Sequence, residues 1–131
     1  MDYKDKTINI LAVDDSNVVR DMVYAELINL GYNHIDLAED GIEALELAKD
    51  NDYDFIITDI NMPNMNGFDL ILSLRNMLDY ISTPIMVLTT EYSDEMKEKG
   101  LSVGATSWIV KPLKTDTLEY AIPKTIKKAQ E

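Results

Sequence analysis

Polar side chains that can bind a metal ion or react with phosphorus follow four short apolar runs of this sequence. These side chains are Asp14, Asp15, Asp59, Asn61, Thr89, Glu91 and Lys111. Carboxylates that are brought close together repel one another, and a divalent cation between them removes that conflict. The chain has no cysteine, so its metal ligands would be oxygen atoms. Mg²⁺ is the natural candidate for such a site.

A carboxylate in this setting can also act as a nucleophile toward phosphorus. Attack by Asp59 on a phosphoryl group would form an aspartyl phosphate, and this transfer needs mainly alignment and neutralisation of charge. Mg²⁺ and the compact ammonium of Lys111 would neutralise the phosphoryl oxygens, and the Thr89 hydroxyl would donate to one of them. The predicted chemistry is therefore phosphoryl acceptance at Asp59.

The elements that must bring these residues together are apolar runs separated by segments with helical periodicity. The runs are Ile8 to Val13, Ile35 to Ala38, Phe55 to Thr58, Ile85 to Leu88 and Trp108 to Val110. They are continuous rather than alternating, which is typical of parallel strands buried on both faces. Their order predicts an α/β fold of about five βα units. Because the carboxyl ends of parallel strands lie along one edge of the sheet, we expect the candidate residues to meet there.

Local signals mark where the intervening helices begin and end. Helix starts are predicted at Asp40 with Glu43, Asn66 with Asp69, Ser93 and Thr115, all of which have capping side chains. Gly31 follows an apolar helical face and is a typical C-terminal cap. Pro123 falls inside the pattern of the last helix, where it removes a backbone donor, so we expect a kink or a break there.

Length and charge limit the classes of protein to consider. With 131 residues, of which 46% are hydrophobic, the chain can bury one sizeable core. We expect a single domain over residues 1–131, with its core at about 7–128 and no output domain. No run suits a membrane span or a signal peptide, so a cytoplasmic protein is expected. We also expect a monomer. The net charge of −12 disfavours nucleic acid and favours protein partners.

Four segments, in this order, resemble the successive motifs of a CheY-like response-regulator receiver domain. They are LAVDDS (Leu11 to Ser16), IITDINMPNMNGFDL (Ile56 to Leu70), PIMVLTTE (Pro84 to Glu91) and GATSWIVKPL (Gly104 to Leu113). The similarity extends from about Ile8 to Ile126. It implies a flavodoxin-like (βα)5 three-layer sandwich with a parallel five-stranded sheet in the order 2-1-3-4-5. It also implies a cis peptide bond between Lys111 and Pro112.

The resemblance assigns a role to each candidate residue. It implies that Asp59 is the phosphoacceptor and that Lys111 and Thr89 assist it. The implied ligands of Mg²⁺ are Asp14, Asp15, Asp59 and Asn61. The residues implied to modulate dephosphorylation are Asn61 and Glu91, and those implied to form the switch are Thr89 and Trp108. The implied output surface is the fourth helix, the fifth strand and the fifth helix.

The same resemblance implies a phosphorylation-activated response regulator of a two-component phosphorelay. Such a protein takes its phosphoryl group from a histidine kinase and then binds a motor-switch or adaptor protein, as in chemotaxis. A phosphatase is a third expected partner. The protein would assist its own phosphorylation and dephosphorylation without being an enzyme. A single-domain receiver in a phosphorelay outside chemotaxis is the nearest alternative.

Three other functions fit parts of the pattern. A phosphatase of the haloacid-dehalogenase type also uses an aspartate after a strand, but it needs an acid two residues later, where this chain has Asn61. A flavin-binding electron carrier shares the architecture, but Asp14 and Asp15 would repel the flavin phosphate. A degenerate receiver that acts only as a scaffold is disfavoured by the presence of Asp59, Lys111 and Thr89.

Overall fold

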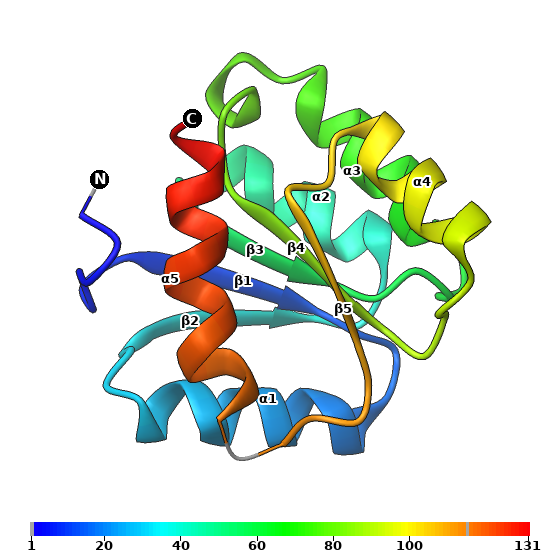
Figure 1. Ribbon diagram of the computed structural model, residues 1–131. Coiled ribbons are helices and arrows are strands. Elements are labelled where there is room, and N and C mark those ends of the chain that lie inside the picture. The colour runs from blue at the N-terminus through cyan, green and yellow to red at the C-terminus, as the bar shows by residue number, and fades with distance from the viewer. Residues whose placement is uncertain (1, 115) are drawn as a thin grey trace.

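Five strands and five α-helices alternate along the residues that the computed structural model describes, 2–114 and 116–131 (Figure 1). The strands are β1 (Asn9–Val13), β2 (His34–Ala38), β3 (Phe55–Thr58), β4 (Ile85–Thr89) and β5 (Ser107–Val110). The helices are α1 (Asn17–Asn29), α2 (Gly41–Asp50), α3 (Gly67–Arg75), α4 (Asp94–Val103), α5 (Thr117–Ala129) and a short 3-10 helix, η1 (Leu78–Tyr80). Over the residues described, none of these helices has the length and apolarity needed to cross a bilayer. The predicted βα repeat is confirmed.

The five strands are parallel and form a sheet in the order β2-β1-β3-β4-β5, as the resemblance implies. Helices α1 and α5 cover one face, and α2, α3 and α4 cover the other, so the molecule has three layers (Figure 1). Val13 of β1 pairs with Thr58 of β3, and Thr58 pairs with Val87 of β4. The carboxyl ends of the three central strands therefore lie side by side. The peptide bond between Lys111 and Pro112 is cis.

Burial along the strands agrees with their apolar runs in the centre of the sheet but not at its edges. Every residue of β3 and β4 is buried. In β2, His34 and Asp36 are exposed, whereas Ile35 and Leu37 are half-buried. In β5, Trp108 alone is buried. The expectation of burial on both faces is wrong for these two strands, because an edge strand has a neighbour on one side only.

Side-chain caps begin four of the helices. The capping residues are Ser16, Asp40, Asn66 and Ser93, each of which accepts a hydrogen bond from the backbone N–H three residues later. Three of them confirm predicted helix starts, whereas Ser16 is a cap that was not predicted from the sequence. Thr115, which is predicted to cap α5, lies outside the described residues. Gly31 has a φ of 98°, the left-handed conformation expected of a C-terminal glycine cap.

The helix α5 continues through Pro123 as one element over Thr117–Ala129, so of the kink or break that was expected, the break does not occur. Proline leaves the carbonyl of Glu119 without its helical donor, but Glu119 is exposed and water can donate instead. The opposite face of α5 is buried through Leu118, Ala121, Ile122, Thr125 and Ile126. Packing of this face against the sheet outweighs the loss of one backbone hydrogen bond.

Candidate phosphorylation site

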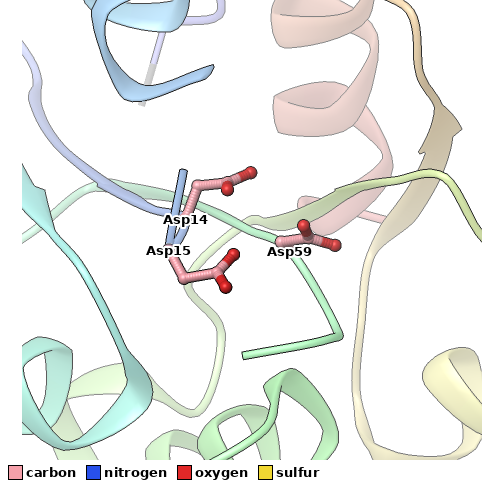
Figure 2. Close-up of side chains that lie close together, drawn as sticks. All are labelled: Asp14, Asp15 and Asp59. Carbon is pink, nitrogen blue, oxygen red and sulfur yellow. The ribbon is translucent and has the colours of Figure 1, made fainter. Parts of the chain in front are cut away.

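Three aspartates meet at the carboxyl ends of β1 and β3 (Figure 2). They are Asp14, Asp15 and Asp59, and one carboxylate oxygen of each lies within 4.8 Å of the others. The backbone N–H of Asp14 donates to the carbonyl of Ala38 (3.1 Å), and that of Asp59 donates to the carbonyl of Val13 (3.0 Å). Asp14 and Asp59 are buried, and Asp15 is exposed. This set of oxygens suits a hard cation that keeps several water ligands.

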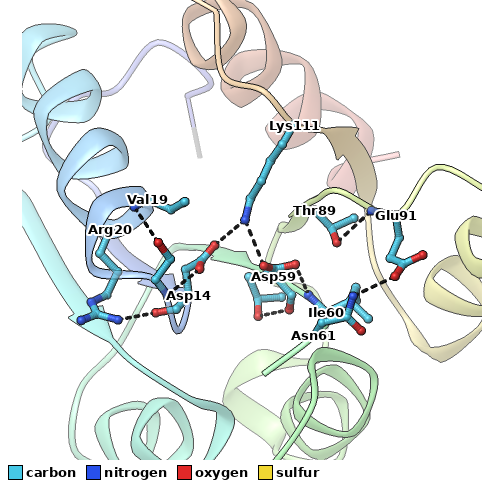
Figure 3. A network of polar contacts seen from close by, with 11 residues as sticks. Asp14, Val19, Arg20, Asp59, Ile60, Asn61, Thr89, Glu91 and Lys111 are labelled. Carbon is cyan, nitrogen blue, oxygen red and sulfur yellow. Dashed lines mark hydrogen bonds and ion pairs between the residues drawn. The ribbon is translucent and has the colours of Figure 1, made fainter. Parts of the chain in front are cut away.

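Lys111, which follows β5, bridges two of these carboxylates (Figure 3). Its Nζ donates to Asp14 Oδ2 at 2.8 Å and to Asp59 Oδ2 at 3.0 Å. Its backbone N–H donates to the carbonyl of Thr89 at the end of β4 (2.7 Å). Burial disfavours the ammonium, but the bonds to both carboxylates outweigh burial and raise the pKa of Lys111. Burial raises the pKa of Asp14, although Lys111 opposes this effect. The lysine thus supplies positive charge to two buried acids.

Backbone groups and an arginine orient the two buried acids. The N–H of Ile60 donates to Asp59 Oδ1 (2.6 Å), and the N–H of Ser16 donates to Asp14 Oδ1 (2.9 Å). Arg20 of α1 donates from Nη1 to the backbone carbonyl of Asp14 (2.6 Å). Each carboxylate therefore has one oxygen bound by backbone and the other by the lysine. Sequence reasoning missed Arg20, because a hydrogen bond to a backbone carbonyl does not depend on the type of the accepting residue and so produces no recognisable motif.

A second hydrogen-bonded group lies beside Asp59 on the β4 side (Figure 3). Asn61 Nδ2 donates to Glu91 Oε1 (2.8 Å), and the backbone N–H of Glu91 donates to Thr89 Oγ1 (3.3 Å). Asn61 is exposed, Glu91 is half-buried and Thr89 is fully buried. The residues that were expected at this edge of the sheet are therefore gathered around Asp59.

Trp108 lies behind this group, between α4 and the end of β4. Its ring is stacked against Phe68, with 6.4 Å between the ring centroids. Its Nε1 donates to the backbone carbonyl of Glu91 (3.0 Å), and 9% of the residue is exposed. The bond from Trp108 to Glu91 could not be predicted, since any backbone carbonyl can accept from an indole.

The loop between β3 and α3 is anchored on the start of α2. Asn64 has a φ of 67°, as expected of an asparagine in a turn. Its Nδ2 donates to Asp40 Oδ2 (2.7 Å). The backbone N–H of Glu43, and then the amide of Asn64, lower the pKa of Asp40. This anchor holds the loop that carries Asn61 next to the acids.

A groove with a volume of about 250 Å³ lies between α4, β5 and α5. Its apolar lining residues include Leu101, Trp108, Ile109, Tyr120 and Ala121, and its basic lining residues are Lys97, Lys124 and Lys128. This local positive charge contrasts with the net charge of −12 on the chain. Because Trp108 also bonds to Glu91, the groove is connected to the acidic site through one side chain.

Comparisons with known proteins agree with this geometry. The family model of the response regulator receiver domain matches residues 10–123. The chain is 36% identical over 119 residues to chemotaxis protein CheY-3 of Vibrio cholerae, covering 91% of this chain and 92% of that protein.

Solved structures extend this similarity to the fold. Chemotaxis protein CheY4 of Vibrio cholerae has a TM-score of 0.87 and 44% identity, covering 91% of this chain and 98% of that chain. Response regulator TrrA of Thermotoga maritima, solved in complex with Mg²⁺ and BeF, has a TM-score of 0.80 and 32% identity. That comparison covers 91% of this chain and 99% of the TrrA chain.

Proposed function

Because the chain belongs to the response regulator receiver family, as a CheY-like domain of a two-component system, we propose that Asp59 accepts a phosphoryl group from a histidine kinase. The cluster of Asp14, Asp15 and Asp59, with oxygens within 4.8 Å of one another, carries this proposal. The similarity of the chain to CheY-3 and CheY4 supports a role in chemotaxis. The domain limits, cytoplasmic location and monomeric state expected from the sequence stay predictions.

Mg²⁺ is the cation that we assign to the acidic cluster. Its ligands would be the carboxylates of Asp14, Asp15 and Asp59 and the carbonyl of Asn61, an all-oxygen set of the kind that Mg²⁺ prefers. When bound, the ion supplies positive charge to the phosphoryl oxygens during transfer. The complex of TrrA with Mg²⁺ and BeF supports this assignment.

In the proposed transfer, a carboxylate oxygen of Asp59 forms a bond to phosphorus while the bond from phosphorus to the donor nitrogen breaks. The donor imidazole leaves with the electron pair of that bond. Lys111, already 3.0 Å from Asp59, moves its ammonium to a phosphoryl oxygen, and Thr89 donates its hydroxyl to another. Hydrolysis later replaces the Asp59 oxygen at phosphorus with the oxygen of water. The protein is thus a phosphoacceptor and not an enzyme that turns over a free substrate.

The direct test is incubation with acetyl phosphate and Mg²⁺, followed by mass spectrometry of the intact protein. We expect the added mass of one phosphoryl group, which hydroxylamine removes because it cleaves acyl phosphates. Chelation of Mg²⁺ should prevent the modification. Absence of any modification would reject the proposal, and steady hydrolysis of para-nitrophenyl phosphate would favour the haloacid-dehalogenase alternative.

Asp15→Asn is expected to weaken binding of Mg²⁺ by roughly tenfold or more, because the site loses one of its negative charges. Asp15 is exposed, and Lys111 contacts the other two acids, so the fold should be unchanged. Isothermal titration calorimetry measures the affinity. Asp69→Asn, on the exposed side of α3, is the matched control and should bind Mg²⁺ as the wild type does. Equal affinity in both variants would remove Asp15 from the ligand set.

The basic groove between α4, β5 and α5 is the surface that we propose for the target protein. Apolar residues line it, and three lysines flank them. An amphipathic helix with acidic residues beside its apolar face complements such a groove in shape and charge. Because the receiver does not chemically modify its target, phosphorylation can act only by changing the affinity of this surface for the target protein.

Lys111→Arg is expected to accept the phosphoryl group but to transmit little change to the groove. The planar guanidinium cannot replace the compact ammonium that contacts both Asp14 and Asp59. The measurement is the change in NMR chemical shifts of Trp108 and Tyr120 when acetyl phosphate is added. The wild type should show clear changes and the variant much smaller ones. Changes of wild-type size in the variant would count against this role of Lys111.

A further inference from the structure

Glu91 connects the phosphorylation site to the groove through hydrogen bonds at three of its groups. Its carboxylate accepts from Asn61 Nδ2 (2.8 Å), and its backbone carbonyl accepts from Trp108 Nε1 (3.0 Å). Its backbone N–H donates to Thr89 Oγ1 (3.3 Å). Trp108 in turn lines the groove. Glu91, which lies just after β4, therefore accepts a hydrogen bond from Trp108 of the groove and another from Asn61.

The indole of Trp108 can make this bond because α4 carries a glycine against its ring. A Cβ at Gly100 would lie 2.4 Å from Trp108 Cζ3 and 2.7 Å from Cε3, closer than non-bonded carbon atoms approach. Phe68 stacks on the ring as well. The indole is thus enclosed between α3 and α4, and its Nε1 is directed at the carbonyl of Glu91.

We propose that Trp108 and Gly100 are positioning residues for Asn61 and thereby set the lifetime of the phosphoryl group on Asp59. The proposal rests on the function proposed above. If the indole N–H is lost, the carbonyl of Glu91 loses this anchor, and its carboxylate binds the Asn61 amide for a smaller fraction of the time. The bonded side chains lie beside Asp59 (Figure 3), and in this proposal they restrict the approach of water to the phosphoryl group. Their release shortens the lifetime.

The first measurement needs no phosphorylation. Trp108→Phe keeps an aromatic ring but removes the indole donor, so the NMR signals of the Asn61 side-chain amide should shift and its protons should exchange faster. Tyr92→Phe is the control, because it removes a polar group from an exposed aromatic residue next to Glu91 and leaves the indole bond intact. An Asn61 amide that is unchanged in Trp108→Phe would overturn the proposal.

The second measurement is the rate at which the acyl phosphate is lost after acetyl phosphate is removed. Trp108→Phe should lose it about two- to tenfold faster, the factor that one hydrogen bond is worth. Gly100→Ala, which displaces the indole, should act in the same direction, and an unchanged rate would remove Gly100 from the proposal.

A double variant separates positioning from a general structural effect. Glu91→Ala removes the carboxylate that binds Asn61 but leaves the carbonyl that binds Trp108. In this background Trp108→Phe should change the rate no further. The same fold-change in both backgrounds would contradict the proposal. If the wild type forms no acyl phosphate, the proposed function fails. The NMR signals of the Asn61 side-chain amide in Trp108→Phe still show, in that case, whether Trp108 positions Asn61.

Discussion

Asp59→Asn is expected to take up no phosphoryl group from acetyl phosphate, even with Mg²⁺ in excess. An amide oxygen does not attack phosphorus as a carboxylate does, so the substitution removes the nucleophile itself. It keeps the shape of the side chain, and the N–H of Ile60 can still donate to its oxygen. Lys111 also keeps its bond to Asp14. The loss should therefore be chemical rather than structural, which mass spectrometry and far-UV circular dichroism together can establish.

Asp21→Asn is the matched control for this experiment. It makes the same chemical change on the exposed side of α1 and should be phosphorylated as fast as the wild type. If Asp59→Asn is modified at the rate of the control, the acceptor is another residue. Asp14 would then be the first candidate, since it shares Lys111 with Asp59.

The candidate site could be predicted because parallel strands place their carboxyl ends along one edge of a sheet. An apolar run followed by an acid is enough to locate Asp14 and Asp59 at that edge, without knowing which strands are neighbours. The strand order itself came from the resemblance, since periodicity does not specify strand pairing. The convergence of Asp14, Asp59 and Lys111 follows from that order, because β1, β3, β4 and β5 are adjacent.

Contacts with backbone acceptors could not be predicted. Trp108 donates to the carbonyl of Glu91, and Arg20 donates to the carbonyl of Asp14. Every residue has a backbone carbonyl, so the sequence does not indicate which carbonyl accepts these bonds. Pro123 shows the reverse error, because a local rule predicted a kink or a break, and tertiary packing prevents the break. Local rules therefore located the elements, whereas the bonds between elements required the structure.

Arg75 is the clearest case of a residue that the sequence does not explain. A basic residue in the last turn of α3 is consistent with simple compensation of the helix dipole. In the structure its Nε and Nη2 donate to the carbonyl of Gly104 (3.0 and 2.7 Å), and its Nη1 donates to those of Tyr80 and Thr83 (both 2.7 Å). Burial lowers the pKa of the guanidinium. Arg75 thus joins α3 to the loops before β4 and before β5.

Arg75→Ala is expected to lower the free energy of unfolding by about 3 kcal/mol or more. Each bond from a charged donor contributes roughly 1.5–3 kcal/mol, and the carbonyls that Arg75 binds would lose it as their donor. Arg75→Lys keeps the charge and most of the stem but not the planar fork, so it should lose an intermediate amount. Urea denaturation followed by circular dichroism gives both values.

Lys49→Ala distinguishes this clamp from a dipole effect. Lys49 is also a basic residue in the last turn of a helix, α2, but its side chain is exposed. If Arg75 acted only on the dipole, both alanine variants would lose the same small amount, about 0.3–1 kcal/mol. A much larger loss for Arg75→Ala would instead follow from the bonds of its guanidinium to the carbonyls of Gly104, Tyr80 and Thr83. Equal losses would show that these hydrogen bonds add little to stability.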